Sequence, residues 1–144
     1  MKKIVIRFNA PVILAFALLS LLALLLGKWT DGAATYQYFS VYRASLSDPL
    51  TYVRFFGHVL GHADYEHYMG NMLLILLVGP GLEEKYGSGT MVWTIAVTAL
   101  VTGLVHFVFF PGSVLLGASG VVFMMIVLSS FTAMRRGEIP ITLI

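Results

Sequence analysis

The charged residues of the chain are clustered, and they leave three long stretches that contain no charge. These stretches are residues 8–27, 67–82 and 86–134, and most of their positions are apolar. A helix needs roughly 20 mostly apolar residues to cross a hydrocarbon core of about 30 Å. Each stretch can therefore be compared with the thickness of a bilayer.

The lengths of these stretches predict four membrane spans. The first stretch fits one crossing, whereas the third is far too long for one, and Pro111-Gly112 near its middle marks a turn that divides it. The second stretch is short, but Tyr65 and Tyr68 lie where aromatic rings anchor a span at the membrane interface. The predicted spans are about 8–27, 65–82, 89–110 and 117–134. The expected fold is all-α, a polytopic transmembrane helix bundle that forms one domain over residues 1–144.

Composition supports a membrane rather than water as the main solvent. Hydrophobic residues make up 58% of the chain and charged residues 11%, whereas soluble domains carry about 25% charged residues. The first apolar run is longer than a signal peptide, and no small-x-small cleavage pattern follows Gly27. The chain has no cysteine, which excludes disulfides and thiolate zinc sites. The net charge of +2 comes from basic residues that flank the spans, so no nucleic-acid partner is expected.

The distribution of basic residues predicts the orientation, because cytoplasmic loops carry an excess of Lys and Arg. A cytoplasmic N-terminus places six basic residues inside and three outside. The inside residues are Lys2, Lys3, Arg7, Lys85, Arg135 and Arg136, and the outside ones are Lys28, Arg43 and Arg54. The short N-terminus without a targeting sequence suits a bacterial inner membrane. We therefore expect an integral protein of that membrane with its N-terminus in the cytoplasm.

The predicted outer loop, residues 28–64, and the first residues after it are rich in aromatic side chains. Ten of the aromatic residues of the chain fall between Trp29 and Tyr68. Aromatic rings favour the headgroup boundary, where their apolar body and polar edge are both satisfied. The composition indicates a loop that lies partly in the membrane interface, and an ordinary extracellular loop with a few anchors is the alternative.

Histidines and an asparagine supply the first candidate site. His67 and Asn71 are four residues apart, so on a helix they share a face and present two hydrogen-bond donors side by side. Polar groups in a bilayer usually point into the protein and mark function, although the pair could also join two helices. His58 and His62 have the same spacing, and a metal site with Asp64 and Glu66 is an alternative to packing or water-holding roles.

A second candidate site is the tetrapeptide Gly117-Ala118-Ser119-Gly120, which lies at the start of the fourth predicted span. A serine at a helix start is surrounded by free backbone N–H groups, which can form part of an oxyanion hole. Small residues on both sides also let a helix or a substrate backbone approach, so a packing surface is the alternative. The tetrapeptide is not the G-x-S-x-G elbow of soluble hydrolases, because Val121 holds the last position.

Together these motifs resemble the rhomboid family of intramembrane serine proteases. The resemblance covers about 48–134 and consists of H-x-x-x-x-H-x-x-x-N, placed in the second span, followed by G-x-S-G at the start of the fourth. It implies that Ser119 is the nucleophile and that His67, Asn71 and the Ser119 N–H hold the oxyanion. It also implies supporting roles for His58, His62, Gly117 and Gly120, transmembrane proteins as substrates, the lipid bilayer as a partner, and no metal or other cofactor.

The chain departs from the family at its end. Rhomboids have at least six spans and use a Ser-His dyad whose histidine lies in the sixth, whereas this sequence stops at Ile144 after an approach to a fifth span at 139–144. We therefore expect an N-terminal portion of a rhomboid protease, with the catalytic histidine beyond Ile144. Serine is a poor nucleophile without an adjacent base, so these residues alone should be inactive.

Three alternatives remain open from the sequence. His106 lies close to the outer turn and could approach Ser119 as the base. The chain could also be a non-catalytic protein that binds transmembrane helices through the same groove. A histidine-lined transporter or metal site is the third reading.

Overall fold

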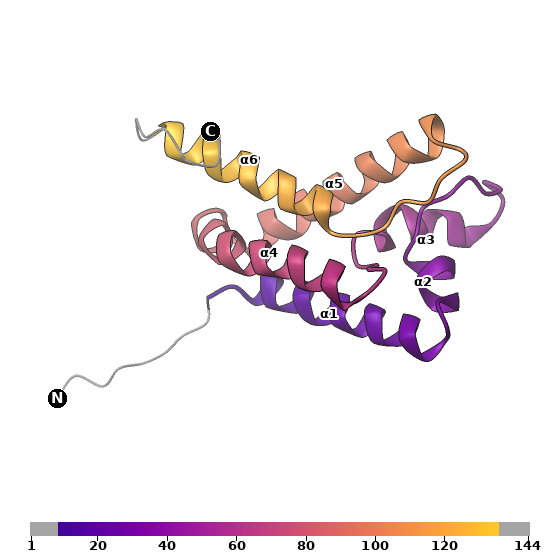
Figure 1. Ribbon diagram of the computed structural model, residues 1–144. Coiled ribbons are helices and arrows are strands. Elements are labelled where there is room, and N and C mark those ends of the chain that lie inside the picture. Colours follow the sequence, from indigo (N-terminus) through magenta and orange to yellow (C-terminus); the bar gives the residue numbers. More distant parts are fainter. Residues whose placement is uncertain (1–8, 136–144) are drawn as a thin grey trace.

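The computed structural model describes residues 9–135, in which the regular elements are six helices (Figure 1). The helices are α1 (Pro11–Trp29), α2 (Ala33–Tyr38), α3 (Pro49–Gly57), α4 (Tyr65–Tyr86), α5 (Ser88–Phe109) and α6 (Ser119–Arg135). Within this part of the chain, β pairing is limited to one antiparallel bridge between Val41 and Leu115. The all-α fold class is confirmed.

The four predicted spans correspond to α1, α4, α5 and α6. Helix α4 continues to Tyr86, beyond the predicted end of the second span, because its charged last turn is still helical and Gly87 ends it with φ of +89°. Two helices, α1 and α5, are long and apolar enough to cross a membrane, and α6 is a shorter apolar helix of 17 residues. Several predictions lie outside the described residues: those for Lys2, Lys3, Arg7 and Arg136, and the approach to a fifth span at 139–144.

The predicted outer loop contains two short helices, α2 and α3, that the hydrophobic pattern did not indicate. Asp48 starts α3 by accepting a hydrogen bond from Leu50 N at 3.0 Å, and Pro49 occupies the first turn. Arg54 of α3 is buried, donates from Nε to Gln37 O at 2.8 Å and lies over the Tyr42 ring. A cap and a buried arginine, rather than an apolar period, therefore position α3, and the arginine joins it to α2.

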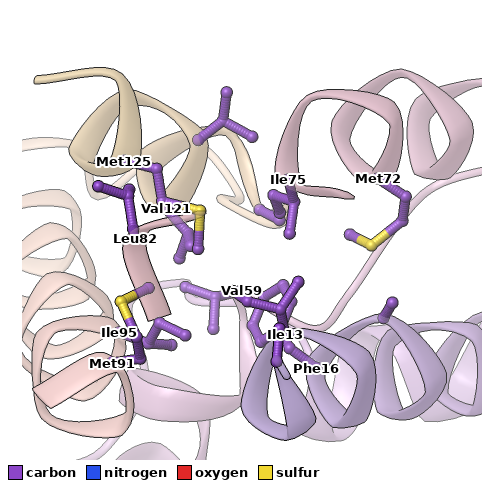
Figure 2. Packing of buried hydrophobic residues seen from close by; sticks show 14 of the residues in the cluster. Ile13, Phe16, Val59, Met72, Ile75, Leu82, Met91, Ile95, Val121 and Met125 are labelled. Atoms are coloured by element: carbon purple, nitrogen blue, oxygen red, sulfur yellow. The ribbon is translucent and has the colours of Figure 1, made fainter. Parts of the chain in front are cut away.

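Helix α4 lies at the centre of the bundle and packs against α1, α5 and α6. Their buried side chains form one apolar cluster, which Figure 2 shows. The cluster includes Ile13 and Phe16 of α1, Met72 and Ile75 of α4, Met91 and Ile95 of α5, and Val121 and Met125 of α6. Large apolar side chains also cover the outside of the same helices, for example Leu18, Leu77 and Val101. An apolar exterior around an apolar core is the pattern expected of a protein in lipid.

Glu83 joins the end of α4 to the start of α1. Its two carboxylate oxygens accept hydrogen bonds from Val12 N and Ile13 N, each at 2.9 Å, and Oε1 also accepts from Ser88 Oγ at 2.7 Å. The first N–H groups of a helix have no partner within the helix, and a negative charge there is favourable. Glu83 therefore has a hydrogen-bonding partner at the end of its own helix, Ser88, and its carboxylate also caps the distant helix α1.

Candidate active site

The first turn of α4 positions the two predicted donors. Asp64 precedes the helix, and its side chain accepts a hydrogen bond from His67 N at 2.8 Å. This cap fixes the start of α4, so that His67 and Asn71 follow one turn apart on the same helix. The expectation of a shared helix face is confirmed. Asp64, which the sequence left open as a metal ligand, is a helix cap.

His67 lies directly against Gly117. Its Nδ1 faces Ala63 N at 3.4 Å and acts as the acceptor, which leaves the proton on Nε2. Gly117 adopts φ of +118°, and a Cβ atom at that position would lie 2.8 Å from His67 Nε2 and 3.7 Å from Asn71 Nδ2. Only glycine allows the loop before α6 to approach the imidazole so closely. The structure therefore brings His67, Asn71 and Gly117 together.

His62 links Asn71 to the segment that carries the serine. Its Nδ1 lies 3.2 Å from Leu60 O, and its Nε2 lies 3.1 Å from Asn71 Nδ2 and 3.4 Å from Ala118 N. These partners assign the tautomer: Nδ1–H donates to Leu60, and Nε2 accepts. The imidazole thus aims the amide group of Asn71 and holds the chain one residue before Ser119.

The environment of His62 favours its neutral form. Burial, followed by electrostatic coupling to the ring of the neighbouring His67, lowers the pKa of His62 from 6.5 to about 4. The ring is 1% exposed and stands edge-on to the rings of His67 and Tyr68. A neutral His62 keeps Nε2 available as an acceptor at neutral pH.

The placement of His62 corrects two sequence expectations. His62 lies three residues before α4, not in the second span, because the helix begins only after the cap at Asp64. Helix α3 ends at Gly57 with His58 as its C-cap, so His58 and His62 do not share one helix face, although they are four residues apart in the sequence.

Among residues 9–135, no group of three His, Cys, Asp or Glu side chains could hold a metal ion.

His58 supports the loop through its backbone and its ring. Its carbonyl accepts from Gly117 N at 2.8 Å, while its Nε2 lies 2.8 Å from Ala99 O and donates to it. Burial lowers the pKa of His58, and its Nδ1 is buried without a hydrogen-bond partner among the described residues. Buried acceptors of this kind are commonly satisfied by water.

Ser119 is the first residue of α6, and its side chain is exposed. Gly120 follows it and faces α5, where an added Cβ would lie 3.4 Å from Thr102 Cγ2. The small residues on either side thus serve different contacts: Gly117 admits His67, and Gly120 lets α6 approach α5. The sequence alone did not indicate this division of roles.

His106 is engaged away from Ser119. Its Nε2 lies 3.1 Å from Ser113 O and 3.3 Å from Ser113 Oγ, and its ring stacks on Phe110. These contacts join the end of α5 to the loop that precedes α6. The geometry gives no support to His106 as the base of Ser119.

The arrangement has the parts that stabilise a developing oxyanion. The Nε2–H of His67 and the amide of Asn71 converge on Gly117, two residues before Ser119. Helix α6 begins at this serine, and the first N–H groups of a helix have no partner within the helix. The His62 contacts with Asn71 and Ala118 were missed by sequence reasoning, because they join residues across a turn rather than along a helix.

Comparison with known proteins points to the same region. The family model described as "Rhomboid domain" matches residues 49–142, about two thirds of the chain. The match includes α3, the histidine-containing turn, and α4 to α6. No curated protein matches the chain.

Proposed function

The chain belongs to the rhomboid family, and from that premise we propose that its site is that of an intramembrane serine protease that cleaves transmembrane segments of membrane proteins. Ser119 is the proposed nucleophile. The observation that carries the proposal is the approach of His67 and Asn71 to Gly117, two residues before that serine. A packing motif alone would not need two side-chain donors at this point.

In the proposed reaction, Ser119 Oγ attacks the carbonyl carbon of the scissile peptide bond. The carbonyl oxygen becomes negative and accepts hydrogen bonds from His67 Nε2–H, the Asn71 amide and the Ser119 N–H. Removing one such donor typically raises the barrier by about 3 kcal/mol. His62 has a positioning role, because it holds the Asn71 amide and Ala118 N.

The reaction also needs a base that accepts the serine proton. His58 Nε2 contacts Ala99, His62 Nε2 contacts Asn71 and Ala118, and His106 Nε2 contacts Ser113. The proposal therefore takes the base from outside residues 9–135, in keeping with the catalytic histidine that the family resemblance implies.

Hydrolysis also needs water at the serine. A cavity of about 430 Å³ lies between α1, α2 and the loop before α6, and His62 forms part of its wall beside Lys28 and Ser40. The cavity supports a supply of water to the site from the end of the bundle that carries the outer loop.

A fluorophosphonate probe tests the proposal, because it labels only an activated serine. The coding sequence after Ile144 is read first, and the whole encoded product is then assayed in membranes. We expect labelling that Ser119→Ala abolishes and that Ser113→Ala, in the preceding loop, leaves intact. His67→Ala or Asn71→Ala should lower the rate of substrate cleavage by roughly 100-fold. Labelling that persists in Ser119→Ala would contradict the assignment.

The second candidate function is a non-catalytic rhomboid-like protein that binds transmembrane helices. The engagement of three histidines with partners other than Ser119 favours it. Its expected signature is an encoded product that ends without a further histidine, does not label with the probe, and still crosslinks to single-span membrane proteins.

A further inference from the structure

Tyr68 joins α4 to α1 beside the candidate site. It follows His67 in the first turn of α4, and its hydroxyl donates a hydrogen bond to Ala17 O of α1 at 2.9 Å. A helical carbonyl has a second lone pair beyond its bond within the helix, so Ala17 can accept this bond as well. Glu83 joins the same two helices from the last turn of α4. Side-chain hydrogen bonds therefore hold α1 against both ends of α4.

The ring of Tyr68 lies against His62. The two ring centroids are 5.5 Å apart, and the ring planes stand at 89° to each other. The ring of His67 also contacts His62, with the centroids 4.9 Å apart. His62 is 1% exposed, so these two rings leave its imidazole little room to rotate. Tyr68 thus limits the orientation of the imidazole whose Nε2 faces Asn71 and Ala118.

Filling space in the bundle would explain the ring of Tyr68 but not its hydroxyl. A phenylalanine would occupy nearly the same space, whereas a hydroxyl in apolar surroundings is costly unless it is hydrogen-bonded. Here the hydroxyl is bonded to the backbone of α1, and the same ring contacts His62. A ring held at its hydroxyl cannot tilt freely. The bond to Ala17 therefore restricts the motion of the ring that lies against His62.

We propose that Tyr68 is a positioning residue for the reaction at Ser119 and that it acts through His62. The hydroxyl bond to α1 fixes the Tyr68 ring, and the ring keeps His62 in the orientation in which Nε2 accepts from Asn71. The inference rests on the proposed function, in which His62 acts by holding the Asn71 amide and the chain before Ser119. Loss of the Tyr68 contact should slow the chemical step and leave substrate binding unchanged.

The kinetics of the whole encoded product in membranes provide the first test. Tyr68→Phe keeps the ring and removes only the hydroxyl, and we expect a several-fold lower kcat with an unchanged KM. Tyr86→Phe is the matched control, because the Tyr86 hydroxyl is hydrogen-bonded to Thr132 and so joins the opposite end of α4 to another helix, α6. This control should keep the wild-type kcat. A kcat of Tyr68→Phe that is no lower than that of Tyr86→Phe would overturn the proposal.

The tautomer of His62 provides a second test, which needs no activity. Nitrogen NMR of protein labelled at its histidines reports the tautomer in detergent, and the His62 signal is the one lost in His62→Gln. We expect the Nδ1–H tautomer in the wild type and in Tyr86→Phe. Tyr68→Leu should show a mixture of tautomers, because removal of the ring frees His62 to rotate. The pKa of His62, about 4 in the wild type, should rise towards 6.5 in this variant as water reaches the ring.

The two tests separate this inference from the proposed function. An unlabelled Ser119 would contradict the proposed function, and the NMR result would still decide whether Tyr68 orients His62. A labelled Ser119 together with an unchanged His62 tautomer in folded Tyr68→Leu would overturn the inference alone. Tyr68→Met, which has a longer side chain, repeats the NMR test if Tyr68→Leu does not fold.

Discussion

Single buried residues join neighbouring helices of this bundle, and Glu83 is the clearest case. One carboxylate accepts three hydrogen bonds and so connects α4, α1 and the start of α5. Hydrogen bonds to a charged group contribute more than neutral ones, and a buried group that loses its partner is costly. The apolar pattern of the sequence places this residue at a helix end but does not reveal its contact with α1, some 70 residues away.

Glu83→Gln should lower the free energy of unfolding by about 2 kcal/mol, because the charge that the α1 N–H groups face is removed. Thermal unfolding in detergent, followed by circular dichroism, measures the change. Glu84→Gln is the matched control, since Glu84 is exposed in the same turn and should change stability little. Equal losses in both variants would exclude the capping role.

Gly117→Ala should strain the loop before α6, because φ is +118° and the new Cβ would lie 2.8 Å from His67 Nε2. We expect a loss of about 1–3 kcal/mol in stability and loss of serine labelling. Gly112→Ala, in the same loop with no atom within 4 Å of its added Cβ, should behave like the wild type. Wild-type labelling and stability in Gly117→Ala would show that the contact with His67 is not required.

His62 should make stability depend on pH. Its pKa is lowered to about 4 in the folded protein from 6.5, so between these values the unfolded chain binds the extra proton. Stability is therefore present in full above pH 6.5, falls as the pH decreases towards 4, and levels off below it. Melting temperatures from pH 7.5 to 3.5 test this, and His62→Gln should flatten the slope whereas His106→Gln should keep it. A flat wild-type profile is the contrary result.

At the scale of helices, the long apolar runs predicted α1, α4, α5 and α6, because burial and lipid exposure both demand apolar residues over a fixed length. The same logic missed α2 and α3, because both are short; α3 begins at a cap on Asp48, and Arg54 of α3 contacts Gln37 of α2. His67 and Asn71 were predictable because they follow a helical spacing. The partnership of His62 with Asn71 was not, since it depends on how the turn at 58–64 folds.

The crossing of α1 and α4 depends on a small residue. At Gly79, an added Cβ would lie 2.7 Å from Ile13 Cδ1, a buried side chain of α1, so the two helices pack closely there. Gly79→Val should cost about 1–3 kcal/mol of stability by overpacking. Gly81→Val is the control in the next half-turn of α4, where nothing lies within 4 Å. Thermal unfolding should separate the two variants, and similar melting temperatures would argue against close packing.

At the scale of the molecule, the distribution of basic residues predicts the orientation of this membrane protein, with its N-terminus in the cytoplasm. The absence of cysteine from residues 1–144 makes the orientation measurable, because a thiol introduced there is the only one among these residues. We expect Gly112→Cys to react with an impermeant maleimide in intact spheroplasts and Gly89→Cys to react only after lysis. The reverse pattern would place the N-terminus outside.

The bridge between Val41 and Leu115 ties the two halves of the outer region to each other through two backbone hydrogen bonds of 2.8 and 2.9 Å. One partner belongs to the aromatic segment that we expect at the headgroup boundary, and the other lies two residues before Gly117. If a thinner or thicker bilayer shifts the level of those aromatic rings, we expect the bridge to pass the displacement to the backbone next to the serine. We therefore expect the geometry of this site to depend on the thickness of the host membrane.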